Sequence, residues 1–414
     1  MRQQSRTWKY LLIALLLLIL LGGLLYANYT FSKNNPGGND FLVHWVGTRS
    51  FLIDGLSPYS DAVALRIQTL VYGRAAQPGE HELRVAYPLY SILLFMPFSL
   101  IADYTWARAA WMTLLEVGLI MLLLMSLKTV GWRPKPWLMA LLLAFTLLWY
   151  HAMRPLVLGN VIILQALCIV TAFSAIKDGE DGRAGLLLAF ATIKPQVVVV
   201  PFIFIFIWAI YQKRWRILGW FMATMVLLAA FATLMLPSWW LENLREVLRY
   251  PAYNPPGSLS AVFAVWWPAQ GGRIGMIVSG LIGLVLLFEW WTNRRSEFNE
   301  ALWTLSITLV LGQWVGIQND PGNFILLFFP IIYVFSIWID RWKHNGQVLV
   351  LISMAILMFG IWVLFIATVE NSYQPIQNPL MFIPLPLFLI AMLYWVRWWA
   401  LRRTRVLAGE TFLK

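Results

Sequence analysis

The chain has 414 residues, of which 60% are hydrophobic and only 12% are charged. A soluble domain carries about 25% charged residues, so this composition excludes an ordinary soluble protein and predicts a polytopic membrane protein. The 24 tryptophans fit that class, because indole rings favour the membrane–water interface. The formal net charge is +12, but most cations fall in short loops between apolar segments. They therefore indicate membrane topology and not nucleic-acid binding.

The amino terminus carries Arg2, Arg6 and Lys9 before an apolar run at residues 10–26. This pattern is similar to the charged and hydrophobic regions of a signal peptide. No clear small-x-small cleavage site follows, so we expect an uncleaved first span with its amino terminus in the cytoplasm. The single cysteine, Cys168, excludes a disulfide within the chain and a cysteine metal site.

The remaining apolar segments predict an all-α protein with about twelve spans, since a span needs about 20 apolar residues. We expect spans near residues 9–29, 106–127, 136–150, 159–176, 184–194, 196–211, 217–236, 274–292, 300–317, 324–339, 348–369 and 380–396. The apolar segment at 87–97 spoils simple alternation, so we expect it to dip into the outer leaflet or lie along it. A full crossing of this segment is the alternative.

The distribution of Lys and Arg predicts the orientation, because cytoplasmic loops carry an excess of these residues. Most of the 31 fall in the loops that would face inward together with both termini, including the basic tail with Arg402, Arg403 and Arg405. Two long regions, 30–105 and 237–273, would face outward, and residues 241–250 have the helical spacing of an interfacial helix. Residues 1–414 show no internal repeat or separate soluble domain.

The first outward region holds the leading catalytic candidate. Asp40 and His44 lie four positions apart, so they share one face of a helix. Asp40 lies where the first span meets the outer surface and is our leading candidate for a catalytic residue. The alternative for Asp40 is a helix amino-terminal cap after residues 36–39. His44 could orient Asp40, and the alternative for His44 is interfacial packing.

Lys194 is the second strong signal, because it stands between two apolar runs and precedes Pro195, which breaks a helix. A charge in such a place must face a cavity or a partner. The alternative is a lysine whose ammonium reaches back to the membrane surface. Arg108 and Arg154 lie at outward span ends and have the same two interpretations.

Neutral polar residues supply further candidates. Tyr59, Tyr87, Asn160 and Gln165 are candidate binding residues, because aromatic faces and amides suit ligands rich in hydroxyls; turn formation or packing is the alternative. Asp320 lies in an outward loop and is a rival base, although the following Pro-Gly also fits a plain turn. Glu116 lies within a span, so we expect it to pair with a neighbouring helix.

Several motifs occur in a fixed order after Asp40 and His44. They are Gly55-Leu56-Ser57-Pro58-Tyr59, Tyr87-Pro88, Pro97-Phe98, Gly159-Asn160-Val161, Ala184-Gly185, Ile193-Lys194-Pro195 and Lys213-Arg214-Trp215-Arg216. In this order the chain resembles bacterial glycosyltransferase family 87 over roughly residues 9–220. That family comprises C-type (GT-C) membrane transferases and includes polyprenol-phosphate-mannose α-mannosyltransferases.

The chain departs from the family pattern in three places. Leu89 stands where the family often has a second proline, and Asn160 stands where it has glutamine. The late outward loop at 318–323 lacks the Ser, Trp and His that mannosyltransferases often carry there. This last departure leaves the identity of the sugar open.

The resemblance implies an inverting transfer of a hexose, with mannose expected, from a polyprenyl-phosphate donor to a lipid-linked or glycolipid acceptor. The reaction would take place on the outer face of the plasma membrane. The leaving group is already a phosphate, so no general acid is needed, unlike glycoside hydrolysis. Asp40, at the depth of a lipid phosphate, would act as base, and Lys194, with Arg108 or Arg154, would stabilise charge on the departing phosphate. His44 could hold the acceptor, and the sugar or acceptor contacts would come from Tyr59, Tyr87, Asn160 and Gln165.

No cofactor or metal is expected. The outward loops contain no Asp-x-Asp pair, and no glycine-rich phosphate loop follows a strand. A transporter or flippase of lipid-linked sugars is one alternative function, but it would need charges through the spans and commonly two related halves. An oligosaccharide polymerase or ligase is another, which Arg245, Arg249 and Arg273 in the late outward region keep open.

Overall fold

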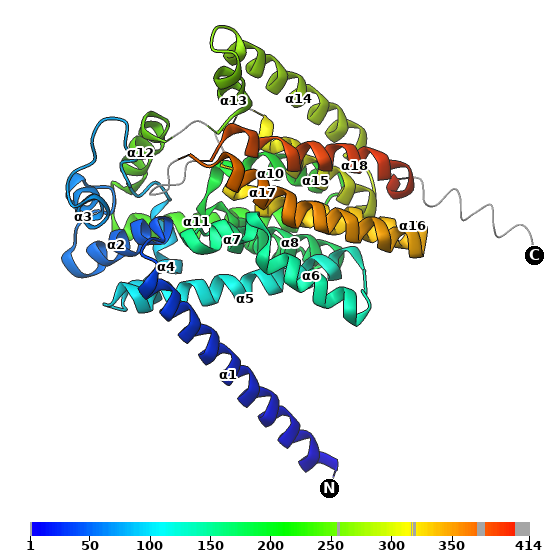
Figure 1. The fold of residues 1–414 in the computed structure, drawn as a ribbon, viewed down its shortest axis with the longest axis horizontal. Coiled ribbons are helices and arrows are strands. Elements are labelled where there is room, and N and C mark those ends of the chain that lie inside the picture. The colour runs from blue at the N-terminus through cyan, green and yellow to red at the C-terminus, as the bar shows by residue number, and fades with distance from the viewer. Residues whose placement is uncertain (1, 255–256, 316, 318–319, 371–376, 402–414) are drawn as a thin grey trace, which may run out of the picture.

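The computed structural model describes residues 2–254, 257–315, 317, 320–370 and 377–401. These residues form helices joined by turns and loops, and no strand occurs among them. Most of the long helices run side by side in one bundle (Figure 1), and the predicted all-α class is confirmed. The basic tail with Arg402, Arg403 and Arg405 lies outside the described residues.

Six helical segments of the described chain are long and apolar enough to cross a membrane. They are Tyr10–Asn34 in α1 (Arg2–Asn34), α5 (Tyr104–Val130), α11 (Trp215–Met235), α14 (Gly271–Asn293), Pro321–Thr368 and Pro379–Ala400. A seventh arises if α6 (Pro136–Leu148) and α7 (Tyr150–Leu158), bent by 47°, form one span. The other predicted spans correspond to shorter helices, so the count of about twelve stays a prediction.

These shorter elements fall where the sequence places them. Residues 159–176 overlap α8 (Ile162–Lys177), 184–194 overlap α9 (Asp181–Phe190), and 196–211 contain α10 (Val199–Tyr211). Residues 300–317 overlap α15 (Phe298–Leu311), while 380–396 overlap α18 (Pro384–Leu401), which is part of the longer Pro379–Ala400 segment. Gly185 lets α9 approach the backbone of α11, because a Cβ there would meet the Ile217 carbonyl oxygen. Close approach at a glycine is typical of helix pairs in membranes.

The Pro321–Thr368 segment contains a sharp break. Within α16 (Phe328–Ala355), Lys343 has φ 45° and ψ −103°, outside helical geometry. Gly346 packs directly on the backbone of Trp338, which leaves no room for a side chain. The chain is therefore divided near the boundary between the predicted spans 324–339 and 348–369, and α17 (Ile361–Thr368) continues the second part.

Residues 87–97 were expected to dip into or lie along the outer leaflet. They contain a 3₁₀ turn, Leu89–Ser91, followed by the eight-residue helix α4 (Ile92–Ser99). A helix of eight residues is about 12 Å long, too short to cross a bilayer alone. It packs against α2 (Asn39–Asp54), and its Phe95 is fully buried.

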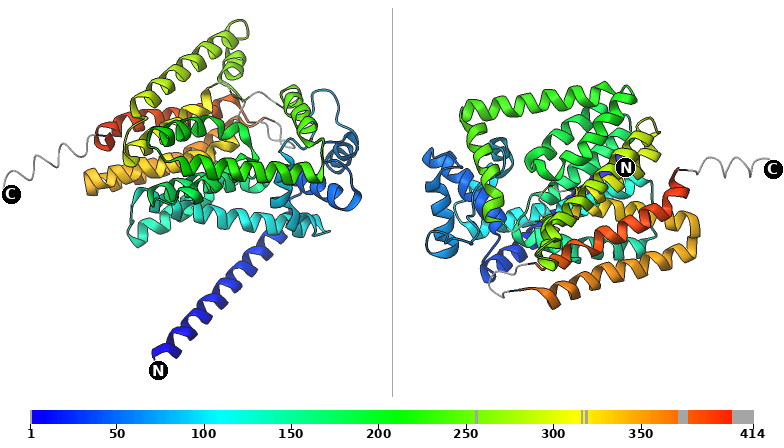
Figure 2. Two further views of the ribbon diagram at one scale, coloured as in Figure 1. Left: turned by 180° about the vertical axis from the view of Figure 1, so that it is seen from behind. Right: turned by 90° about the horizontal axis from the view of Figure 1, so that it is seen from above.

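The two predicted outward regions lie together at one end of the bundle. α2, α3 (Asp61–Tyr72) and α12 (Trp239–Tyr253) gather there, opposite the end from which the carboxyl terminus leaves (Figures 1 and 2). Arg84 pairs with Glu246 at 2.7 Å, and Arg249 pairs with Glu82 at 2.7 Å. Ion pairs thus join the first outward region to α12, the helix predicted at 241–250.

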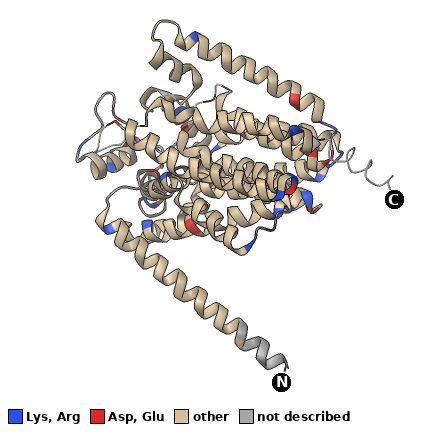
Figure 3. Ribbon diagram, turned by 45° about the vertical axis from the view of Figure 1, so that its right-hand side comes forward, with Lys and Arg blue, Asp and Glu red and all other residues tan. Residues whose placement is uncertain are grey.

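The predicted inward loops also meet one another. Lys128 pairs with Asp178 at 2.7 Å, Lys177 donates to the Thr129 carbonyl at 2.7 Å, and Gln212 donates to the Ser296 carbonyl at 2.6 Å. Figure 3 shows the helices between the two ends mostly free of charged residues. The grouping of loops agrees with the predicted alternation, while their assignment to membrane sides remains a prediction.

α1 runs away from the bundle along most of its length (Figure 1). Only its carboxyl-terminal part is anchored: Asn28 donates to Glu116 of α5 at 2.7 Å, and Ser32 contacts Met112. The expectation that Glu116 pairs with a neighbouring helix is confirmed. The anchored end of α1 leads directly into the turn that begins α2.

Candidate active site

The turn between α1 and α2 fixes the position of Asp40. Gly37 and Gly38 have φ of 143° and 79°, and a Cβ on Gly38 would lie 2.5 Å from Arg108 Nε. Both features require glycine. The amino-terminal cap of α2 is Gly38, which has no side chain to bond the helix end. Asp40 is therefore not the cap that the alternative interpretation expected. Asp40 lies in the first turn, where the helix dipole favours a carboxylate.

Asn160 holds the Asp40 side chain. Its Nδ2 donates to Asp40 Oδ2 at 2.8 Å, and its Oδ1 accepts from the Ile162 amide at 3.0 Å. Gly159, with φ 73°, ends α7 immediately before it, and its carbonyl accepts from Trp111 Nε1 at 2.8 Å. A Cβ on Gly159 would lie 2.5 Å from the Phe41 Cβ. Close packing therefore places Asn160 against the start of α2.

Lys194 lies on irregular backbone between the 3₁₀ turns η2 (Ala191–Ile193) and η3 (Pro195–Val197). It is only 7% exposed, and its Nζ donates to Asn323 Oδ1 at 2.7 Å. The ammonium is therefore turned into the protein, against the alternative of a side chain reaching for the membrane surface. Lys194 also interacts electrostatically with Asp40 and Asp320.

The charges around Asp40 act in opposite directions. Burial raises the pKa of Asp40, and Asp320 adds to this rise. Lys194, the hydrogen bond from Asn160 and the Arg154 guanidinium all lower it. The net effect is a pKa above the usual range of an aspartate. A carboxylate with a raised pKa is a better proton acceptor than an ordinary aspartate.

His44 lies one helical turn beyond Asp40 and is 7% exposed. Its ring stacks between Tyr87, at a centroid distance of 4.0 Å, and Phe95, at 4.7 Å. Burial, with a smaller effect from Lys194, lowers the pKa of His44 to about 3. The ring is therefore neutral at physiological pH and packs as an aromatic group, the alternative that the sequence left open.

The two predicted tyrosines contribute differently. Tyr59 is buried, and its hydroxyl donates to the Tyr87 carbonyl at 2.8 Å, so it supports the backbone of the other tyrosine. Tyr87 stacks on His44, and burial together with the Asp40 charge raises its pKa well above the usual range. Its hydroxyl stays protonated and able to donate a hydrogen bond.

The Arg108 guanidinium bonds backbone carbonyls, whereas an arginine that holds a phosphate would face the site. Arg108 is 1% exposed, and its guanidinium donates to the carbonyls of Asn35 at 2.7 Å and Val157 at 3.1 Å. It also lies 5.7 Å from the Phe31 ring centroid. These contacts hold the end of α1 against α7, so the structure gives Arg108 a packing role near the turn that precedes Asp40.

Arg154 and Asp320 lie on facing segments. Asp320 accepts from the Gly322 amide and so caps η5 (Pro321–Leu327), as the plain-turn alternative expected. A Cβ on Gly322 would lie 3.8 Å from Arg154 Nε, which places the guanidinium beside this turn. Both residues interact electrostatically with Asp40.

Gln165 is 1% exposed and donates from Nε2 to the Ala191 carbonyl at 2.7 Å. It therefore fixes the 3₁₀ turn immediately before Lys194. Among the described residues the structure brings together Asp40, Asn160, Lys194, Arg154 and Asp320, with Tyr87 and His44 beside them. Gln165, Tyr59 and Arg108 support the surrounding backbone.

Sequence reasoning missed several residues of this region, including Asn323, His151 and Tyr250. Asn323 contacts Lys194, and His151 Nδ1 lies 2.9 Å from the Pro321 carbonyl. Tyr250, on α12, has its pKa raised by burial and by the charges of Asp40 and Asp320. Only Asn323 carried a signal, as part of the loop at 318–323 that departs from the family pattern; residues 318 and 319 of that loop lie outside the described residues.

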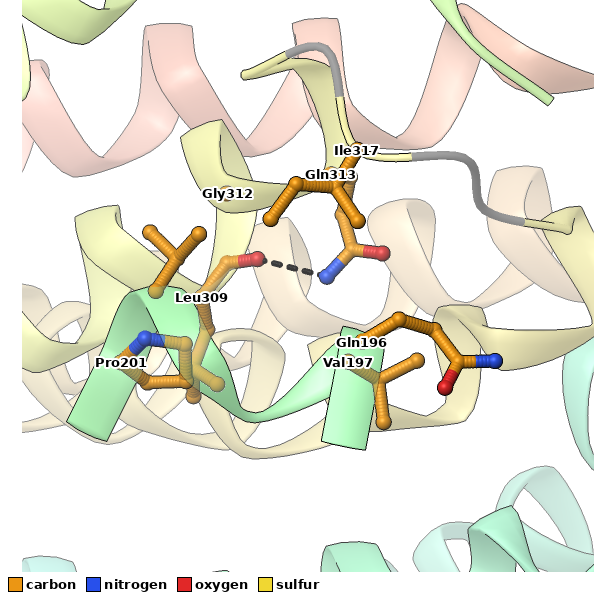
Figure 4. Close-up of a pocket in the computed structure, with 8 residues that line it drawn as sticks. Gln196, Val197, Pro201, Leu309, Gly312, Gln313 and Ile317 are labelled. Carbon is orange, nitrogen blue, oxygen red and sulfur yellow. Dashed lines mark hydrogen bonds between the residues drawn. The ribbon is translucent and has the colours of Figure 1, made fainter. Parts of the chain in front are cut away.

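A small cavity begins just beyond Lys194 and Pro195. Gln196, Val197, Pro201, Leu309 and Gln313 are among its lining residues (Figure 4). Its volume of about 10 Å³ has room for about one water molecule and not for a sugar. Within the described ranges, no three His, Cys, Asp or Glu side chains are grouped so that they could hold a metal ion.

A match to a known protein family agrees with this geometry. The model of glycosyltransferase family 87 matches residues 86–315, more than half of the chain. The chain belongs to glycosyltransferase family 87. No curated protein and no solved structure matches it. The resemblance expected from the motifs is confirmed, although the match starts later than residue 9 and extends beyond residue 220.

Membership of family 87 identifies the protein as a membrane glycosyltransferase. The matched region contains Asn160, Lys194 and Arg154, whereas Asp40 and Asp320 lie on either side of it. The family 87 region thus brings an amide and two cations to a carboxylate supplied by α2. A carboxylate beside a buried ammonium suits a reaction in which a hydroxyl loses a proton and a phosphate departs.

Proposed function

We propose that this family 87 protein transfers a hexose, with mannose the expected sugar, from a polyprenyl-phosphate donor. The acceptor is the hydroxyl of a lipid-linked glycan or a glycolipid. The transfer takes place on the outer face of the plasma membrane and inverts the anomeric centre. Family membership supports the transferase activity, while the donor, the sugar and the stereochemistry belong to the proposal.

One observation carries this proposal. A carboxylate, Asp40, and a buried ammonium, Lys194, interact electrostatically although they come from α2 and from the break between α9 and α10. Asn160 fixes the first at 2.8 Å, and Asn323 fixes the second at 2.7 Å. Because Asp40 and Lys194 are held separately, the carboxylate can act on the acceptor hydroxyl while the ammonium acts on the leaving phosphate.

The reaction assigns a role to each group. Asp40 takes the proton of the acceptor hydroxyl as its oxygen bonds to the anomeric carbon of the sugar. The bond from that carbon to the phosphate oxygen breaks, and its electron pair leaves with the polyprenyl phosphate. Lys194 stabilises the charge that develops on this phosphate, with help from Arg154. A single displacement of this kind inverts the configuration.

The arrangement of the bundle supports an outward site. α2, which carries Asp40, lies at the end of the bundle where the two regions assigned to the outside gather (Figure 1). The inward loops gather at the other end. In this topology both termini are cytoplasmic and the fold is of the C type with about twelve spans. A lipid-borne donor then presents its phosphate at the depth of α2.

Purified protein tests this function directly. It should consume a polyprenyl-phosphate hexose, assayed within a panel of polyprenyl-phosphate sugars, and release polyprenyl phosphate. We expect no transfer from a sugar nucleotide supplied alone, because the proposed donor carries its sugar on a polyprenyl phosphate. Transfer from the nucleotide sugar, with no use of any lipid-phosphate sugar, would overturn the proposal while leaving the family assignment intact.

A further inference from the structure

Asn323 is the neutral partner of the buried cation. It is 2% exposed, and its Oδ1 accepts a hydrogen bond of 2.7 Å from Lys194 Nζ. A lysine ammonium has three donors, so this contact occupies one of them. Because the lysine side chain is flexible, a fixed partner is what gives its ammonium a defined position.

The backbone around Asn323 is itself anchored. Its amide donates to the Asp320 carbonyl at 2.8 Å, and the Asp320 carboxylate accepts from the Gly322 amide. His151, fully buried on α7, lies with Nδ1 2.9 Å from the Pro321 carbonyl. A carbonyl only accepts, so this nitrogen carries the proton. α7 thereby holds the turn that carries Asn323.

The amide of Asn323 affects the charge of Lys194 differently from a carboxylate. Lys194 interacts with the carboxylates of Asp40 and Asp320, either of which could attract the ammonium and cancel its charge. An amide oxygen binds an ammonium without neutralising it. The positive charge then remains available to an anion, and the lysine is kept from collapsing onto the base.

We propose that Asn323 is a positioning residue that holds Lys194 for the phosphate of the lipid-linked donor. This role rests on the proposed function, because it presumes that Lys194 meets a phosphate. It extends the site beyond the family 87 match, which ends at residue 315, and it uses the loop where the chain departs from the family pattern. Asn323 itself touches Lys194 and need not touch the donor.

Two substitutions at Asn323 separate this role from a purely structural one. Asn323→Ala removes the partner and should raise the donor KM about tenfold, the usual order for a hydrogen bond to a charged group. Asn323→Asp should raise it further, by roughly 30-fold or more, because a carboxylate pairs with Lys194 and cancels its charge. The acceptor KM should change less than about twofold in both variants.

Stability gives the contrasting readout. The aspartate variant should unfold at a temperature no lower than that of the alanine variant, since it keeps a partner for Lys194. Donor affinity and stability would then rank the two variants in opposite orders. A purely structural role predicts the same order of the two variants in donor affinity and in stability, with the aspartate variant close to wild type in each measurement. That result would overturn the proposal. Asn293→Ala is the control, because Asn293 is also buried and donates to the Glu289 carbonyl in the predicted inward loops.

Binding of polyprenyl phosphate without a sugar separates this inference from the proposed function. We expect detergent-solubilised wild type to be stabilised by this ligand, and Asn323→Asp to lose at least tenfold in apparent affinity. Wild-type protein that binds the ligand but transfers no hexose would overturn the function alone. Unchanged binding by both Asn323 variants, in protein that transfers hexose normally, would overturn the positioning role alone. If Asn323→Ala does not fold, Asn323→Ser replaces it with the same expectations.

Discussion

Asn160 Nδ2 donates a 2.8 Å hydrogen bond to Asp40 Oδ2, and Asn160 Oδ1 accepts from the Ile162 amide at 3.0 Å. One amide therefore joins the start of α2 to the start of α8. Because the bond favours the ionised carboxylate, it opposes the effect of burial on the pKa of Asp40. Asn160 thus orients the candidate base and favours its ionised form, which can accept a proton.

Asn160→Ala should lower the transfer rate about tenfold, because the lost bond involves a charged acceptor. It should also raise the pKa of Asp40 further, so the acid limb of the pH–rate profile should move to higher pH. Initial rates measured across pH test both effects. Asn378→Ala is a matched control, since Asn378 caps the Leu380 amide in the same way without touching Asp40. An unchanged rate and acid limb would remove Asn160 from the site.

The raised pKa of Asp40 has a consequence for stability. Its ionisation is easier in the unfolded chain, so the unfolded state binds fewer protons between pH 3.8 and the folded-state pKa, and stability falls as pH rises through that interval. Asp40→Asn keeps an acceptor for Asn160 and removes this cost. At pH 7 we expect a melting temperature higher by about 1–3 °C. The gain should vanish below pH 4; a loss of stability at pH 7 would show that the ionised form is favoured in the fold.

Lys194→Ala should impair use of the donor more than use of the acceptor. The ammonium would meet the leaving phosphate, so its loss should lower kcat/KM for the donor by roughly 100-fold or more. Steady-state kinetics with each substrate varied in turn measure the two effects. Lys177→Ala is the control, because that lysine bonds a backbone carbonyl in the loops at the opposite end. An unchanged kcat together with an unchanged donor KM would contradict a phosphate role.

The ion pair between Arg84 and Glu246 joins the first outward region to α12, and both side chains are 7% exposed. Arg84 also pairs with Asp61 and Glu82, so it is the loss of Arg84 that leaves a buried charge, the Glu246 carboxylate, uncompensated. Arg84→Ala should therefore destabilise the protein by about 3 kcal/mol. Arg183→Ala breaks the exposed pair with Glu180 and should cost about 0.5 kcal/mol or less. Thermal unfolding of the two variants in one detergent measures the difference. Equal shifts would mean that α12 is not held by its charges.

The sequence predicted the charged part of the site and, among its neutral residues, Asn160 and Tyr87. Asp40 and Lys194 stand out because a charge in apolar surroundings has few explanations. The same reasoning selected Arg108, whose guanidinium bonds the carbonyls of Asn35 and Val157, since a charge alone does not reveal its partner. Asn323 and Tyr250 are neutral and distant in sequence, so only tertiary packing brings them near the charges.

The fold shows a similar division. Helix class and most helix positions follow from long apolar runs, and the break at Lys343 falls between two predicted spans. The bend between α6 and α7 did not follow, because Trp149 is as apolar as its neighbours and leaves the helix only through its backbone, with ψ 154°. Nor could hydropathy place α12 against residues 82–86, because that contact depends on individual ion pairs and hydrogen bonds.

The most direct test of the account is the rate of hexose transfer from polyprenyl-phosphate mannose by Asp40→Asn, with Asp54→Asn as its control. Asp54 lies at the other end of α2 and pairs with Arg66, so its loss should leave the rate within about twofold. For Asp40→Asn we predict a loss of about 1,000-fold or more in folded protein, because general-base catalysis contributes up to about 10⁴-fold. A rate within about threefold of wild type would contradict Asp40 as the base.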